Sequence, residues 1–93
     1  MRWMLIQKIL MSPKIAEKIK CKHGLDPIVA KEVLEGYSTC YIGKVGGDNY
    51  MAIGLCSAGY VTVFFEYEAG TAEIKTAYTS SNWQIDLYKK KRG

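Results

Sequence analysis

The segment from residue 49 to residue 78 constrains the fold most, because it has the pattern of three antiparallel strands joined by two short turns. Met51, Ile53 and Leu55 alternate with other residues, as in a strand with one apolar face. Residues 60–67 are almost all β-branched or aromatic on both faces, which is typical of a central strand. A sheet of this kind must bury a face against helices. The segment therefore predicts a meander with helices packed on it.

Two short helices are predicted before the meander from their capping residues. Each begins at a serine or aspartate followed by proline, because the side-chain oxygen caps the first N–H groups and the fixed φ of proline suits the first turn. Each ends at a glycine. The starts are Ser12-Pro13 and Asp26-Pro27, and the ends are Gly24 and Gly36. The expected inward-facing residues are Ile15 and Ile19 in the first helix and Ile28, Val29, Val33 and Leu34 in the second.

A third helix is predicted after the meander. Ser81 and Gln84 have the spacing of a capping box, and the helix that they start carries Trp83 and Leu87 four residues apart. The tail at 89–93 is basic. Its lysines either favour the helix dipole and solubility or contact a nucleic acid or a protein partner.

Further strands complete the predicted fold. Residues 38–45 have the composition of a strand, and residues 46–49 form a turn into the meander. Residues 3–11 are apolar enough for an edge strand, and the pattern also fits a short helix. We therefore predict one α+β domain over residues 1–93. It has a four- to five-stranded, mainly antiparallel sheet packed against two N-terminal helices and one C-terminal helix.

Charge is divided unevenly along the chain, whose net charge is +4. The basic excess lies in residues 1–44 and in the tail. Residues 45–88 are acidic overall, and Lys75 is their single basic residue. This distribution excludes a uniformly basic RNA-binding surface.

The cysteines and the single histidine do not form a standard zinc set, because the gaps between Cys21, Cys40 and Cys56 are long. We expect no metal and no cofactor, and three small buried or half-buried thiols in a reducing cytosol. The apolar run at residues 3–6 is too short to span a membrane and lacks the features of a signal peptide. A cytoplasmic protein without a membrane partner is expected.

Three features are candidates for chemistry. His23 is the only histidine, and imidazole exchanges protons readily near neutral pH, but the residue also suits the last turn of a helix. Tyr78, at the end of the last strand, is either a core aromatic or a site residue at the strand-to-helix corner. Lys14, Lys18 and Lys22 form an i,i+4 row that is either a solvated face or a surface for phosphate or an acidic partner.

Several segments resemble a known family of bacterial proteins. PKIAEKIKCKHGLDPIVAKEVL is similar to the KHG-then-helix corner of the BrnT family, and IGLCSAGYVTVFFEY resembles the central hairpin of that family. EIKTAYTSSNWQIDLY resembles its closing strand and helix, and also the ending of a neighbouring uncharacterised small-protein family. The resemblance covers most of residues 12–90. BrnT belongs to the RelE/ParE-like superfamily of toxins.

The resemblance implies a helix pair packed on an antiparallel sheet, ribonuclease activity and silencing by a cognate antitoxin. Lys22 and His23 stand where the family has Lys-His before its glycine. Tyr78 stands where the family has an arginine that is expected to act on RNA phosphate. The bidentate phosphate clamp of a guanidinium is therefore missing from this position.

From this resemblance we predict the toxin of a type II toxin–antitoxin pair, which acts on RNA as an endoribonuclease. Its partners would be RNA and an antitoxin; the oligomeric state is left open. Lys22 would bind phosphate, His23 would transfer a proton, and Tyr78 would stack on a base or orient the phosphate. The additional RNA-binding residues would be Lys18, Lys75, Lys89 and Lys90.

The alternative is a catalytically inactive protein-interaction module on the same fold, which binds a small protein through the row at Lys14, Lys18 and Lys22. A small-ligand or metal-binding domain has the least support, because the residues of a metal site are missing.

Overall fold

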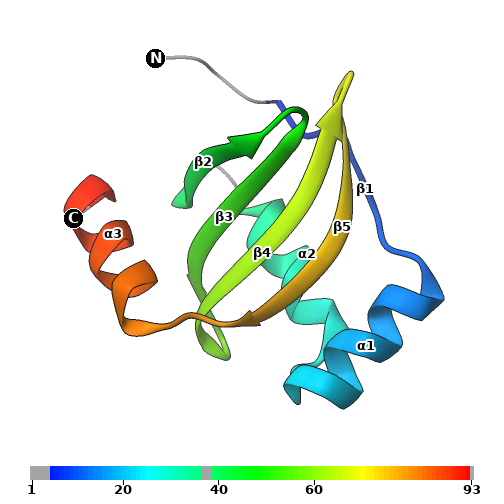
Figure 1. The fold of residues 1–93 in the computed structure, drawn as a ribbon, viewed down its shortest axis with the longest axis horizontal. Coiled ribbons are helices and arrows are strands. Elements are labelled where there is room, and N and C mark those ends of the chain that lie inside the picture. The colour runs from blue at the N-terminus through cyan, green and yellow to red at the C-terminus, as the bar shows by residue number, and fades with distance from the viewer. Residues whose placement is uncertain (1–4, 37–38, 93) are drawn as a thin grey trace.

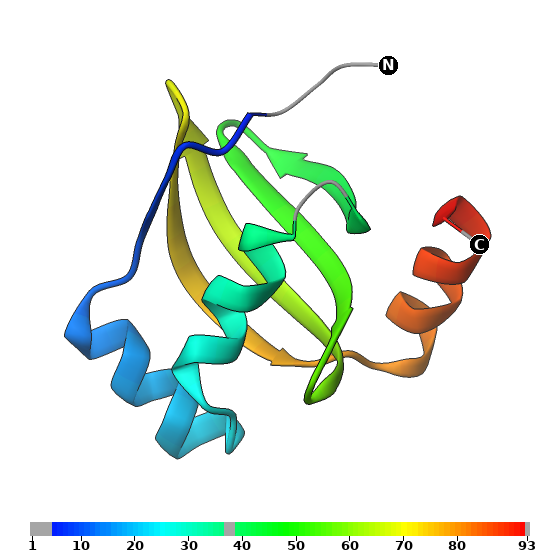
Figure 2. The same cartoon turned by 180° about the vertical axis from the view of Figure 1, so that it is seen from behind.

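The computed structural model describes residues 5–36 and 39–92. Five strands form one sheet in the order β1-β5-β4-β3-β2. Helices α1 and α2 cover one face of the sheet, and α3 follows β5 to the other side (Figure 1; seen from behind in Figure 2). The elements are β1 (Lys8–Leu10), α1 (Pro13–His23), α2 (Pro27–Glu35), β2 (Tyr41–Gly46), β3 (Asn49–Cys56), β4 (Gly59–Glu68), β5 (Thr71–Thr79) and α3 (Asn82–Arg92). The predicted α+β class is confirmed.

The predicted meander is confirmed as β3, β4 and β5, with β4 at the centre of the sheet. Val61, Val63 and Phe65 of β4 are fully buried on the face that packs against α2. The turn between β4 and β5 has two residues with positive φ, Ala69 at 51° and Gly70 at 85°. Two such residues match the right-handed twist of the strands that they join.

Both edge strands are short. Residues 8–10 pair in parallel with β5, so this part of the N-terminal segment is an edge strand, whereas residues 5–7 and 11 are in neither a strand nor a helix. Tyr67 Oη donates a hydrogen bond of 2.8 Å to the carbonyl oxygen of Leu5, which holds this segment to the sheet. The other edge strand, β2, begins at Tyr41 rather than at residue 38, which lies outside the described residues. The turn into β3 is tighter than predicted, since only residues 47 and 48 lie outside the strands.

The capping predictions are confirmed. Ser12 Oγ accepts a hydrogen bond of 3.2 Å from the N–H of Ile15, and Asp26 Oδ1 accepts one of 3.1 Å from the N–H of Ile28. Gly24 ends α1 with φ at 63°, in the left-handed region. These local signals fix where the two helices begin and end, and both helices lie on the same face of the sheet (Figure 2).

Ile28 and Cys21 are exposed, contrary to the prediction, and the large apolar residues Leu55 and Trp83 are exposed as well. Ile28 is 59% exposed, because the buried stripe of α2 starts one residue later and includes Ala30. Leu55 is 60% exposed near the end of β3, although Ile53 on the same face of the strand is fully buried. Trp83 is also 60% exposed, and Gln84 takes the buried position of α3. Cys21 is exposed on α1, whereas Cys40 is buried and Cys56 is half-buried.

Thr76 provides a test of polar burial. Its hydroxyl oxygen is buried on β5 without a hydrogen-bond partner among the described residues. We expect Thr76→Val to raise the free energy of unfolding by about 1 kcal/mol, because an unpaired buried hydroxyl is removed at nearly constant shape. Urea denaturation measures this change.

The matched control is Thr62→Val. Thr62 is fully buried, and its hydroxyl is 2.7 Å from that of Ser80, so this variant should lose about 1–2 kcal/mol by leaving Ser80 unpaired. Equal losses in the two variants would contradict the assignment.

Candidate functional site

The two candidate catalytic residues, far apart in the sequence, lie side by side. His23 is the last residue of α1, and Tyr78 lies near the end of β5. Their ring centroids are 5.7 Å apart at an interplanar angle of 44°. Helix α1 packs along β5, so its C-terminus carries the imidazole to the tyrosine (Figure 1). Both side chains are half-buried and therefore partly accessible.

Tyr78 belongs to the face of the sheet opposite α1 and α2, which we call the open face. It is next to Thr62 in register, and both point away from the buried Val63 side. The ring of Phe64, on the same face of β4, lies 5.9 Å from that of Tyr78 at 32°. We call His23, Tyr78 and Phe64 the ring row.

Gln84 fixes the hydroxyl of Tyr78. Gln84 Oε1 accepts hydrogen bonds of 2.9 Å from the N–H of Ser81 and 3.1 Å from its hydroxyl. This orients the amide nitrogen toward Tyr78 Oη, to which Nε2 donates a bond of 3.0 Å. Because the tyrosine oxygen already accepts this bond, its own proton is free to be donated to another group, such as a phosphate oxygen.

Lysines surround the ring row on two helices. Lys18 and Lys22 are exposed one turn apart on α1, and Lys22 directly precedes His23. Lys89 and Lys90 are exposed on α3, and Lys89 Nζ lies 5.8 Å from the centroid of the Tyr60 ring. These positions leave the ammonium groups available to anions.

Lys75 has different surroundings. Its ammonium lies 3.5 Å from a carboxylate oxygen of Glu66 and 3.6 Å from one of Glu73. These residues lie at the end of the sheet that carries the β2–β3 and β4–β5 turns, where Asp48 and Glu68 are also exposed. We call Asp48, Glu66, Glu68 and Glu73 the acidic end. Two carboxylates beside one ammonium leave this end of the sheet negative.

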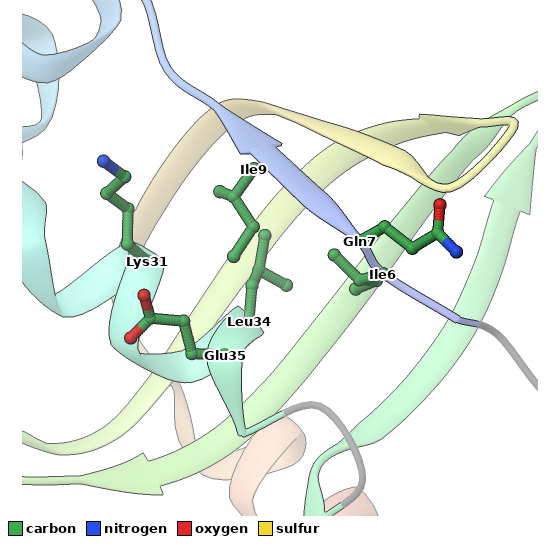
Figure 3. Close-up of a pocket in the computed structure, with 6 residues that line it drawn as sticks. All are labelled: Ile6, Gln7, Ile9, Lys31, Leu34 and Glu35. Carbon is green, nitrogen blue, oxygen red and sulfur yellow. The ribbon is translucent and has the colours of Figure 1, made fainter.

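Two pockets are lined by residues outside the ring row. One of about 360 Å³ lies between β1 and α2, with Ile6, Ile9 and Leu34 beside Lys31 and Glu35 (Figure 3). A second of about 310 Å³ lies at the corner between α1 and α2 and is lined by Lys20, Gly24, Leu25, Asp26 and Pro27. Neither contains a residue of the ring row.

Neither a metal cluster nor a membrane-spanning helix is found in the described part of the chain. No group of three or more His, Cys, Asp or Glu residues within it could hold a metal ion. Its helices are also too short or too polar to cross a membrane.

Sequence reasoning missed Phe64 and the role of Gln84. The sequence pattern places Phe64 only within the predicted central strand at residues 60–67, and its half-buried position is visible only in the structure. Gln84 was identified only as a cap. A capping residue that is also fully buried has a second partner, and here it is Tyr78.

No protein-family model matches the sequence, and no curated protein matches it. One solved structure is similar, that of the ribonuclease toxin BrnT of Brucella abortus. It superposes with a TM-score of 0.68 and 22% identity, over 81% of this chain and 97% of the other. The chain has the BrnT fold. This confirms the resemblance noted in the sequence at the level of architecture, including the helix pair on the sheet.

Proposed function

We propose that this protein is the toxin of a toxin–antitoxin pair and cleaves RNA in the cytoplasm. The observation that carries the proposal is the contact between His23 and Tyr78 on the open face of a BrnT-like sheet. The structural neighbour is a ribonuclease toxin. Lys22 precedes His23 at the end of α1 and supplies a cation for the phosphate.

The proposed roles combine these contacts with the chemistry of RNA cleavage. In RNA cleavage the 2′ hydroxyl loses its proton as its oxygen attacks the adjacent phosphorus. The P–O5′ bond breaks, and the leaving 5′ oxygen gains a proton. His23 transfers the proton, since imidazole can both accept and donate one near neutral pH. Tyr78, held by Gln84, donates its proton in a hydrogen bond to a phosphate oxygen. Lys22 stabilises the charge that develops on the phosphorane.

A tyrosine in place of a guanidinium predicts a slow enzyme. A neutral hydroxyl offers one hydrogen bond, whereas arginine offers two parallel charge-assisted bonds to a phosphate. Lys75 is left out of the proposed RNA site, because Glu66 and Glu73 already neutralise it.

The test replaces His23 by alanine. We expect the purified parent protein to cleave RNA and His23→Ala to be slower by about 10²- to 10⁴-fold, because proton transfer is lost. Growth of a bacterial culture after induction of the chain alone should stop with the parent and continue with the variant. Gel analysis of the RNA and culture density measure the two effects.

Cys21→Ala is the matched control, because Cys21 is exposed on the same helix two residues away. It should retain cleavage and toxicity. A folded His23→Ala protein that cleaves RNA as fast as its parent would refute the catalytic assignment.

The exposed lysines of α1 favour a second candidate, a catalytically inactive module that binds a small protein. Lys14, Lys18 and Lys22 are all exposed on one face of α1. This candidate predicts a folded parent protein that cleaves no RNA, and a partner affinity that falls when the three charges are reversed. Unchanged affinity would exclude it.

A further inference from the structure

The ring row has the composition of a stacking surface. His23, Tyr78 and Phe64 come from three different elements, and successive ring centroids are 5.7 Å and 5.9 Å apart. All three rings are half-buried, so each is supported by the protein and still reachable. Met51, half-buried beside Phe64 in the β3–β4 register, extends the apolar surface. Nucleic-acid bases stack on surfaces of this kind, and such stacking tolerates any base.

The aromatic residues on the other face differ. Phe65 is fully buried, and Tyr50 stacks on it at 5.9 Å as part of the core. Phe64, the next residue to Phe65, has no such cover from α1 and α2, because it points to the open face. The core therefore does not account for the ring row.

The charges restrict where a phosphate chain could run. Lys18 and Lys22 are exposed on α1, and Lys89 and Lys90 are exposed on α3. The two helices lie at opposite edges of the sheet, α1 beside β5 and α3 beside β2 and β3 (Figure 1). The acidic end lies at the turns farthest from His23 and would repel phosphate, because Glu66 and Glu73 exceed the single charge of Lys75. A strand that crosses from α1 to α3 passes the ring row and avoids the acidic end.

We propose that the open face binds single-stranded nucleic acid along this path. Bases stack on Tyr78 and Phe64, and phosphates contact Lys18 and Lys22 on α1 and Lys89 and Lys90 on α3. A duplex fits less well, since its bases are already stacked and paired and cannot meet the rings. The proposal rests on the proposed function only for the choice of RNA as the natural ligand, because stacking and phosphate contacts need no 2′ hydroxyl.

Because stacking and phosphate contacts need no 2′ hydroxyl, binding to the open face can be tested separately from RNA cleavage. Single-stranded DNA lacks the 2′ hydroxyl that attacks in RNA cleavage, so the intact protein can bind it but cannot cut it. Fluorescence anisotropy of a labelled oligothymidine measures its affinity. We expect Phe64→Leu to weaken binding by about 5- to 100-fold, because leucine retains apolar volume but removes the ring. Phe64→Tyr, which restores a ring, should bind like the parent.

Charge reversal tests the path. The double variants Lys18→Glu/Lys22→Glu and Lys89→Glu/Lys90→Glu should each weaken binding and flatten its dependence on salt, since fewer counterions are released. Lys44→Glu is the matched control, because Lys44 is exposed on β2 near the turn end of the sheet. Its affinity should change far less than that of either double variant.

Three results would overturn the inference: equal affinity of folded Phe64→Leu and the parent, an equal loss in Lys44→Glu, or equal binding of duplex and single strand. These outcomes are distinct from failure of the proposed function. If RNA is bound through the ring row but not cleaved, the proposed ribonuclease function is refuted and the proposed binding path is supported. If RNA is cleaved but Phe64→Leu does not change the binding of oligothymidine, the ribonuclease function is supported and the binding path is refuted.

Discussion

Phe65→Ala is expected to lower the free energy of unfolding by about 3–5 kcal/mol, as for other aromatic residues removed from a packed core. Phe65 is fully buried in the central strand and has the largest side chain among the fully buried residues that the structure describes. Its loss also removes the ring on which Tyr50 stacks. Since a small domain is stable by only about 5–15 kcal/mol, this variant should unfold at a much lower urea concentration.

Phe64→Ala is the matched control. The same side chain is removed one residue away, but from the half-buried open face. Its loss of stability should be clearly smaller than that of Phe65→Ala. If the two variants unfold at the same urea concentration, the assignment of the two sheet faces is incorrect.

Gly54→Ala is expected to cost about 1–3 kcal/mol, although alanine is usually a mild replacement in a strand. A Cβ atom at Gly54 would lie 2.7 Å from Cys40 Sγ and 3.2 Å from Val33 Cγ1. Cys40 cannot move freely, because its thiol donates a hydrogen bond of 3.2 Å to the carbonyl oxygen of Val33. The small residue is therefore required by the close approach of the segment before β2 to β3.

Cys40→Ala provides the compensating change, because it removes the sulfur that the new methyl group would meet. The double variant should be more stable than the sum of the single losses predicts, with a coupling of about 0.5–3 kcal/mol. Gly46→Ala is the control, since no atom lies within 4 Å of a Cβ there, and it should change stability by less than about 0.5 kcal/mol. Additive losses at positions 40 and 54 would show that the clash is relieved in another way.

Local signals predicted the elements well. Ser12, Gly24 and Asp26 act within one turn of the chain, so their effects can be read without tertiary information. The meander is equally local, because each strand pairs with its sequence neighbour. His23 and Tyr78 are candidates from their residue types and positions alone, and the resemblance to BrnT adds the roles expected of them.

Orientations and distant pairings were harder to predict. Leu55 and Ile28 follow apolar patterns, yet the position of the helices leaves both exposed. The parallel pairing of β1 with β5 has no local signature, since residues 8–10 contain nothing that specifies a partner. Gln84 is buried because its amide satisfies Ser81 and Tyr78 together, and that depends on the path of the chain after β5.

The parallel edge strand also has a consequence for the order of folding. Strand β1 is synthesised before every other element, but its partner β5 follows all the other strands. Tyr67 and Leu5, which are joined by a hydrogen bond, lie 62 residues apart in the chain. Closing so long a loop costs chain entropy before the contacts between β1 and β5 can stabilise the closed chain. We therefore expect the meander to form first and β1 to join it late. The chain must therefore emerge from the ribosome past β5 before the N-terminal edge is closed, and Tyr78 becomes available to His23 at the same stage.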